Sequence, residues 1–222
     1  MTFKFGDLVT FLLAYSIAIP AVVGMALLKK VDKRFLPFIL ILIAGLITEV
    51  FYDVWRYWYP QRHPSIPYKA YLIIENLFYL WLFYNLEIIA KQSWLWIIAG
   101  FNLLFYCLQL SNGGSAWHSF FPAYILFGCE HLVCAVLLMS KQVLEVNIPL
   151  LKNPKFLLAL PVAVYFAYVV LQISIAYWFG QFPELSASAM SIQKVINPLC
   201  NLFFVYTLLC LPRHQTYSSS SS

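Results

Sequence analysis

Residues 35–56 read FLPFILILIAGLITEVFYDVWR, and this stretch decides the class of the protein. It carries no charged residue before Glu49. It is also long enough to cross the hydrocarbon core of a bilayer as a helix, which takes about 20 predominantly apolar residues. The stretch therefore predicts a transmembrane helix, and the protein is expected to be an all-α, polytopic integral membrane protein.

Comparable apolar segments follow one another along almost the whole chain, with short loops between them. They predict about seven transmembrane helices, at 8–28, 35–56, 68–90, 93–111, 119–140, 156–179 and 188–211. Little chain remains for a second unit, so residues 1–217 are expected to form a single transmembrane helical domain. The serine run at 218–222 is expected to be disordered.

The composition supports a membrane protein and narrows the classes of function. Hydrophobic residues make up 62% of the chain, charged residues only 10%, and the mean hydropathy is +0.77; a soluble domain usually carries about 25% charged residues. The net charge of +5 comes from basic residues at loop ends, which excludes nucleic acid as a partner. The five cysteines lie inside apolar segments without metal or redox spacing. We therefore expect no cofactor and no metal site.

Lysine and arginine residues predict the orientation, because cytoplasmic loops are rich in both. With the N-terminus outside, nine of them lie on the inner side and four on the outer side. The inner set is Lys29, Lys30, Lys33, Arg34, Lys91, Lys141, Lys152, Lys155 and Arg213, and the outer set is Lys4, Arg56, Arg62 and Lys69. This excess predicts an N-out, C-in orientation.

Polar residues inside the predicted helices are the main guide to function, because ionisable groups are costly in a bilayer. Several of them share the outer half of the membrane. The expected ligand-binding residues are Glu49, Asp53, Glu75, Gln109, His118, Gln172, Lys194 and Asn197. Lys194 is the only cation among them, and Glu49 and Glu75 are its expected counter-charges. The set predicts a polar intramembrane cavity. The alternative is that these groups hold the helices together by hydrogen bonds.

Glu130 and His131 stand near the middle of the segment at 119–140. Adjacent helical residues point about 100° apart, so the two side chains are expected to face different neighbours. A proton relay is one interpretation of this pair. A packed, hydrogen-bonded pair is the other.

Two short motifs resemble a known family. Gly45-Leu46-Ile47-Thr48-Glu49-Val50 and Tyr71-Leu72-Ile73-Ile74-Glu75-Asn76-Leu77 are similar to segments of uncharacterised small multi-helix inner-membrane proteins of Bacteroidota. Those proteins often carry a Thr-Asp/Glu step in the second helix and a Tyr-x-x-x-Glu step in the third. The resemblance covers about the first 90 residues. It implies an inner-membrane location and no known activity, and it points to Glu49 and Glu75 as the acids of interest.

These observations favour binding or sensing of a small molecule or lipid in the outer-half cavity. The protein then acts alone, as a homo-oligomer, or as the membrane component of an assembly with a membrane-protein partner. No catalytic residue is assigned. One alternative is a small proton-coupled transporter, which predicts a polar path to the inner side through Asn102, Glu130 and His131. Another is a membrane-embedded lipid-modifying hydrolase, which predicts that Glu49, Glu75 and His118 converge.

Overall fold

The computed structural model describes residues 15–59, 65–113, 120–145, 149–178 and 183–212, and in these ranges it contains helices and no strand. Two of our expectations lie outside the described residues, namely His118 and the serine run at 218–222. The helices are η1 (Tyr15–Ile17), α2 (Ala18–Leu27), η2 (Lys33–Phe35), α3 (Leu36–Trp58), α4 (Ser65–Asn85), α5 (Gln92–Gly113), α6 (Phe121–Glu145), η4 (Leu150–Lys152), α7 (Pro154–Trp178) and α8 (Pro183–Cys210).

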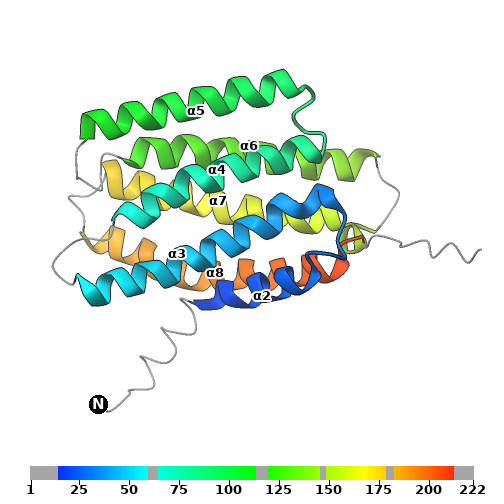
Figure 1. Cartoon of the computed structure of the whole chain (residues 1–222), viewed down its shortest axis with the longest axis horizontal. Helices are drawn as coiled ribbons and strands as arrows, with labels where there is room; N and C mark the ends of the chain where they lie inside the picture. Colours follow the sequence, from blue (N-terminus) through cyan, green and yellow to red (C-terminus); the bar gives the residue numbers. More distant parts are fainter. Residues whose placement is uncertain (1–14, 60–64, 114–119, 146–148, 179–182, 213–222) are drawn as a thin grey trace, which may run out of the picture.

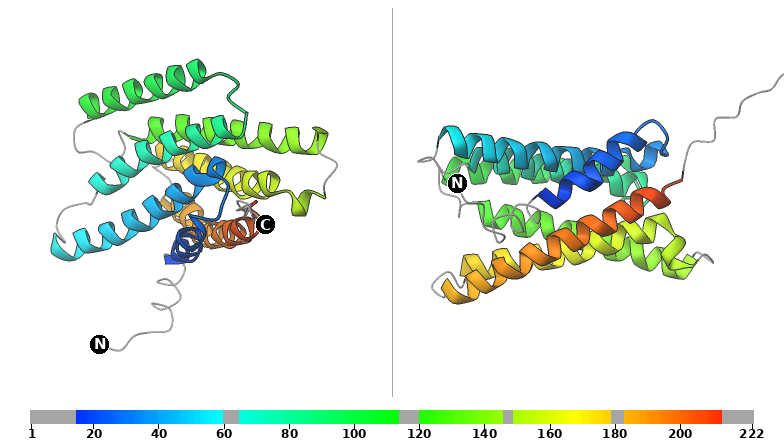
Figure 2. Two further views of the ribbon diagram at one scale, coloured as in Figure 1. Left: turned by 45° about the vertical axis from the view of Figure 1, so that its right-hand side comes forward. Right: turned by 90° about the horizontal axis from the view of Figure 1, so that it is seen from below.

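The long helices lie side by side, and each runs antiparallel to the one before it in the chain (Figure 1). Helix α6 packs along α7, α7 along α8, and α3 along α4, while the short α2 rests on α3 and α8. Helix α5 lies at the edge of the bundle, beyond α4 and α6 (Figure 2). This arrangement leaves α3, α4, α6, α7 and α8 around a common interior.

Five helices are long and apolar enough to cross a membrane, which agrees with a helical membrane protein. They cover Lys33–Trp58, Gln92–Ser111, Phe121–Leu144, Pro154–Trp178 and Ala187–Cys210. The apolar helix Tyr15–Leu27 is shorter. Helix α4 has 21 residues but carries Lys69, Glu75 and Asn76 within them, and these lower its hydropathy. The count of seven transmembrane helices therefore stays a prediction.

Two helix ends differ from the expected ones for local reasons. Helix α4 ends at Asn85 and not at 90, because Glu87 adopts a left-handed φ of 63°. The Ile88 N–H then donates to Phe83 C=O and the Glu87 N–H to Tyr84 C=O, the Schellman arrangement that closes a helix. Helix α7 begins at 154 and not at 156, because Asn153 Oδ1 accepts the N–H groups of Lys155 and Phe156 as an N-cap.

The apolar core fills one half of the bundle. It joins Phe38 and Leu42 of α3, Phe83 of α4, Leu138 of α6 and Leu158 of α7, each at most 2% exposed. The same half ends in a group of eight basic residues, which we call the basic end. They are Lys29, Lys30, Lys33, Arg34, Lys91, Lys141, Lys152 and Lys155. We call the opposite end, where α4, α6 and α8 begin, the cavity end.

Glycine sets the close approach of α6 and α7. A Cβ atom added to Gly128 would lie only 2.6 Å from Val170 Cγ2. A contact this short does not occur between real side chains, so a larger residue would force Val170 or the two helices to shift. Small residues at such crossings let membrane helices pack backbone against backbone.

Two side chains of α5 fasten it to the rest of the bundle by hydrogen bonds. Asn102 Nδ2 lies 2.6 Å from Glu130 Oε2 on α6 and 3.2 Å from Asn76 Oδ1 on α4. The Tyr106 hydroxyl donates to the backbone carbonyl of Lys69 at 2.7 Å. Asn76 and Asn102 are fully buried, where a hydrogen bond is costly to lose. Glu130 is therefore part of a hydrogen-bonded contact between helices.

Candidate functional site: a polar cavity at one end of the bundle

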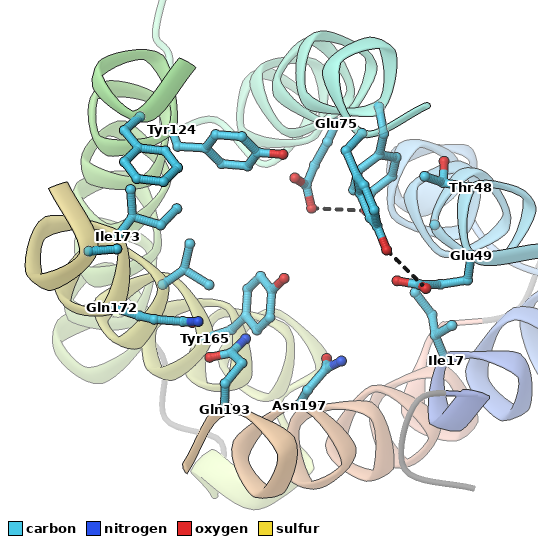
Figure 3. A pocket seen from close by; sticks show the side chains of 16 residues that line it. Ile17, Thr48, Glu49, Glu75, Tyr124, Tyr165, Gln172, Ile173, Gln193 and Asn197 are labelled. Carbon is cyan, nitrogen blue, oxygen red and sulfur yellow. Dashed lines mark hydrogen bonds between the residues drawn. The ribbon is translucent and has the colours of Figure 1, made fainter. Parts of the chain in front are cut away.

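A cavity of about 440 Å³ opens between α3, α4, α6, α7 and α8 at the cavity end. Figure 3 shows side chains from all of these helices, and Ile17 from η1, arranged around it. Its polar lining residues are Thr48, Glu49, Tyr68, Tyr71, Glu75, Tyr124, Tyr165, Gln172, Gln193 and Asn197. The volume lies in the range of about 300–1,000 Å³ that is typical of small-molecule sites.

Helical spacing places these side chains on the inward faces of their helices. Tyr68, Tyr71 and Glu75 stand at i, i+3 and i+7 on α4, and Gln193 and Asn197 stand at i and i+4 on α8. Each set therefore follows one face of its helix.

Gly45 closes one wall of the cavity. A Cβ atom added there would lie 2.5 Å from Ile17 Cδ1 and 3.2 Å from the Tyr71 hydroxyl oxygen. The absence of a side chain at Gly45 thus lets η1 and α4 approach α3 beside the two acids.

Each carboxyl group of the cavity accepts a hydrogen bond from a tyrosine. The Tyr71 hydroxyl lies 3.0 Å from Glu75 Oε1, and the Tyr68 hydroxyl lies 3.3 Å from Glu49 Oε2. Glu75 is only 8% exposed. The tyrosines orient the carboxyl groups, but a neutral hydroxyl adds no positive charge to balance a carboxylate.

The expected ion pairing of Lys194 with Glu49 and Glu75 is wrong. Lys194 is exposed and does not line the cavity. Its neighbour Gln193 faces the cavity, and a rotation of about 100° per residue turns the lysine away. In the described part of the chain, the ion pairs are Arg34–Asp32 and Lys141–Glu87, both at the basic end.

Lys69 is the other cation near the acids, and it is engaged elsewhere. Its ammonium nitrogen lies 4.1 Å from the centre of the Phe120 ring, as a cation–π contact. Lys69 is 8% exposed and does not line the cavity. The described lining therefore contains two acids and no basic side chain.

Four of the eight residues predicted to bind a ligand line the cavity: Glu49, Glu75, Gln172 and Asn197. Asp53 does not, because it points to the exposed side of α3 and accepts a hydrogen bond from Tyr15. Gln109 does not either, because α5 lies at the edge of the bundle.

The prediction missed the tyrosines Tyr68, Tyr71, Tyr124 and Tyr165, which supply much of the lining. Aromatic residues are common at membrane interfaces, so composition alone does not single these four out. The available signal was the spacing of Tyr68 and Tyr71 relative to Glu75, which puts all three on one face of α4.

A second, smaller cavity of about 30 Å³ extends from the Glu75 side toward His131. This volume is enough for a water molecule. His131 is 1% exposed, and the centre of its ring lies 4.7 Å from the ring centres of both Tyr79 and Phe166. Its Nδ1 atom is buried without a hydrogen-bond partner. Glu130 lines neither cavity, so the two adjacent residues face different neighbours as expected.

A third hollow differs in character from these two. A groove of about 400 Å³ lies between α4 and α5 and is lined mainly by apolar and aromatic residues, among them Trp81 and Trp96. It contains no ionisable group apart from Tyr84. The described residues also contain no group of three or more His, Cys, Asp or Glu side chains that could hold a metal ion.

No family model, no curated protein and no solved structure matches this chain. The candidate site is therefore interpreted from its own geometry.

Proposed function

We propose that the protein is a multi-pass membrane protein that binds a small molecule in the cavity between α3, α4, α6, α7 and α8. The observation that carries the proposal is the convergence of ten polar side chains from these five helices on one cavity of about 440 Å³. Polar side chains that only hold helices together contact each other directly, as Asn102 and Glu130 do. The cavity side chains instead surround open volume.

The other half of the bundle supports binding over transport. Its core is apolar and closely packed from α3 to α8, with Phe38 against Phe204 at a ring separation of 5.3 Å. A carrier needs a polar route through this half. The transporter hypothesis expects Asn102 and Glu130 on this route, but the two side chains form a hydrogen bond to each other between α5 and α6.

One observation favours a proton-coupled carrier as the second candidate. The small cavity joins Glu75 to the buried, unpartnered Nδ1 atom of His131. A water molecule there would connect an acid of the large cavity with a titratable group deeper in the bundle.

We propose an orientation from the basic end. Eight lysine and arginine residues lie there, and Arg56 and Lys69 lie near the other end, so the positive-inside rule favours a cavity on the outer side of the inner membrane. We expect alkaline phosphatase fused after Gly113 to be active in a bacterial host and green fluorescent protein fused after Lys91 to fluoresce. The reverse pattern would contradict this orientation.

Binding is tested by blocking the cavity without removing a polar group. Ala176 lines the cavity, and Ala176→Trp would fill part of it. Native mass spectrometry of the wild type in mild detergent is expected to show a small molecule bound one to one, and the variant is expected to lose it. Leu171→Trp, on the exposed face of α7, is the matched control and keeps the ligand. Equal occupancy in all three proteins, or a wild type without ligand, would overturn the proposal.

A further inference from the structure

The charge balance of the cavity indicates what kind of molecule it binds. Glu49 and Glu75 line it, no basic side chain does in the described part of the chain, and both nearby lysines are turned away. A carboxylate taken out of water is costly unless it is paired with a positive group. The bundle orients both carboxyl groups with tyrosine hydroxyls, and among the described residues that line the cavity there is no such partner.

The aromatic side chains add a second, independent indication. Tyr68, Tyr71, Tyr124 and Tyr165 lie around the same volume as the two acids. In Figure 3, Tyr165 and Tyr124 point into it from α7 and α6, across from Glu49. Aromatic faces attract cations, and cages of aromatic rings are a common device for binding quaternary ammonium groups.

The amide side chains are consistent with a ligand that donates hydrogen bonds. Gln172, Gln193 and Asn197 line the wall opposite Glu75 (Figure 3). The Oε1 atom of Gln193 is buried without a hydrogen-bond partner. An unpartnered acceptor on this wall can receive a hydroxyl or ammonium hydrogen from a bound molecule.

We propose that the cavity binds a small organic cation, with an ammonium group held between Glu49, Glu75 and the faces of the tyrosine rings. This inference rests on the proposed binding function and specifies its ligand class. A metal ion is a poorer fit, because metal sites need several ligands converging at about 2–2.6 Å. The lining instead surrounds a volume of about 440 Å³, and the described residues contain no group of three or more potential His, Cys, Asp or Glu ligands.

The test compares cations with uncharged molecules of the same shape on the full-length protein in mild detergent. Choline is paired with dimethylbutanol, in which carbon replaces the quaternary nitrogen, and butylammonium is paired with butanol, in which a hydroxyl group replaces the ammonium group. Sodium chloride at equal ionic strength controls for salt. We expect at least one cation to raise the melting temperature saturably, and to bind about tenfold or more tightly than its uncharged partner in isothermal titration calorimetry.

Variants of Tyr165 test whether the cation binds in this cavity. Tyr165→Leu is expected to lower the affinity of that cation about 3- to 30-fold, and Tyr165→Phe to lower it less, because phenylalanine keeps the aromatic face. Tyr57→Leu removes an exposed tyrosine outside the cavity and is expected to leave the affinity unchanged.

The results of these experiments distinguish a failure of the proposed ligand class from a failure of the proposed binding function. Equal binding of cation and uncharged partner would overturn the cation proposal, while loss of a co-purified ligand from Ala176→Trp would still support the binding function. Absence of binding by all four compounds would also overturn the cation proposal. Equal occupancy of wild type and Ala176→Trp by any co-purified molecule would overturn the binding function itself.

Discussion

Replacing Gly128 by leucine is expected to lower the melting temperature of the protein in mild detergent by roughly 5–10 °C. A Cβ atom at this position would already lie 2.6 Å from Val170 Cγ2, and leucine adds three further carbon atoms. Valine in a helix strongly prefers one χ1 rotamer, so moving its methyl group aside is costly, and we expect α6 to move away from α7. Because α6 and α7 both line the cavity, we expect ligand occupancy to fall with stability. Intrinsic tryptophan fluorescence during heating provides the measurement.

The chain offers a matched control for this change. A Cβ atom on Gly100 of α5 would meet nothing within 4 Å, and the residue is exposed. Gly100→Leu is therefore expected to be neutral or slightly stabilising, since leucine favours a helix over glycine by up to about 1 kcal/mol. Equal losses in the two variants would show that the α6–α7 contact is not the tight crossing described.

Replacing Glu75 by glutamine is expected to separate ligand binding from folding. Glutamine has nearly the same volume and keeps a carbonyl oxygen for the Tyr71 hydroxyl, which now lies 3.0 Å from Glu75 Oε1. We therefore expect the melting temperature to change by only about 2 °C. The quaternary nitrogen of choline has no hydrogen to donate, so its attraction to Glu75 is between opposite charges, worth roughly 1–4 kcal/mol at about 4 Å. Glutamine removes this attraction, so the affinity for a bound cation such as choline should fall about 10- to 100-fold.

Glu87→Gln at the basic end is the control for this experiment, because Glu87 is exposed and remote from the cavity. It is expected to leave the affinity for choline unchanged. If Glu75→Gln instead lowered both the melting temperature and the affinity for choline, the role of Glu75 would be to hold the helices together. The cavity would then be a by-product of packing.

The sequence predicted the helices well, because long apolar runs are set by the thickness of the bilayer. The expected segment at 35–56 corresponds to α3, Leu36–Trp58, and that at 93–111 to α5, Gln92–Gly113. Helix ends were less predictable. The left-handed φ of 63° at Glu87 ends α4 early, and residues other than glycine rarely adopt this conformation, so no residue type signalled it.

The sequence predicted how deep the site residues lie in the bundle, but not the direction in which each side chain points. Counting turns from the loops placed Glu49, Glu75, Gln172 and Asn197 at one level, and all four line the cavity. Depth cannot say which way a side chain faces, and Lys194 lies at a similar depth but points outward. The depth of a residue also does not determine which helices surround the interior of the bundle. Gln109 does not line the cavity because α5 lies at the edge of the bundle, a consequence of tertiary packing.

The most direct test of the binding cavity is an experimental structure of the full-length protein in lipid nanodiscs, with a saturating concentration of choline or butylammonium, whichever binds more tightly. The account predicts density for the cation between Glu49, Glu75 and the ring of Tyr165, within the cavity at the end of the bundle where α4, α6 and α8 begin. An empty cavity, or a cation found only in the apolar groove between α4 and α5, would contradict it.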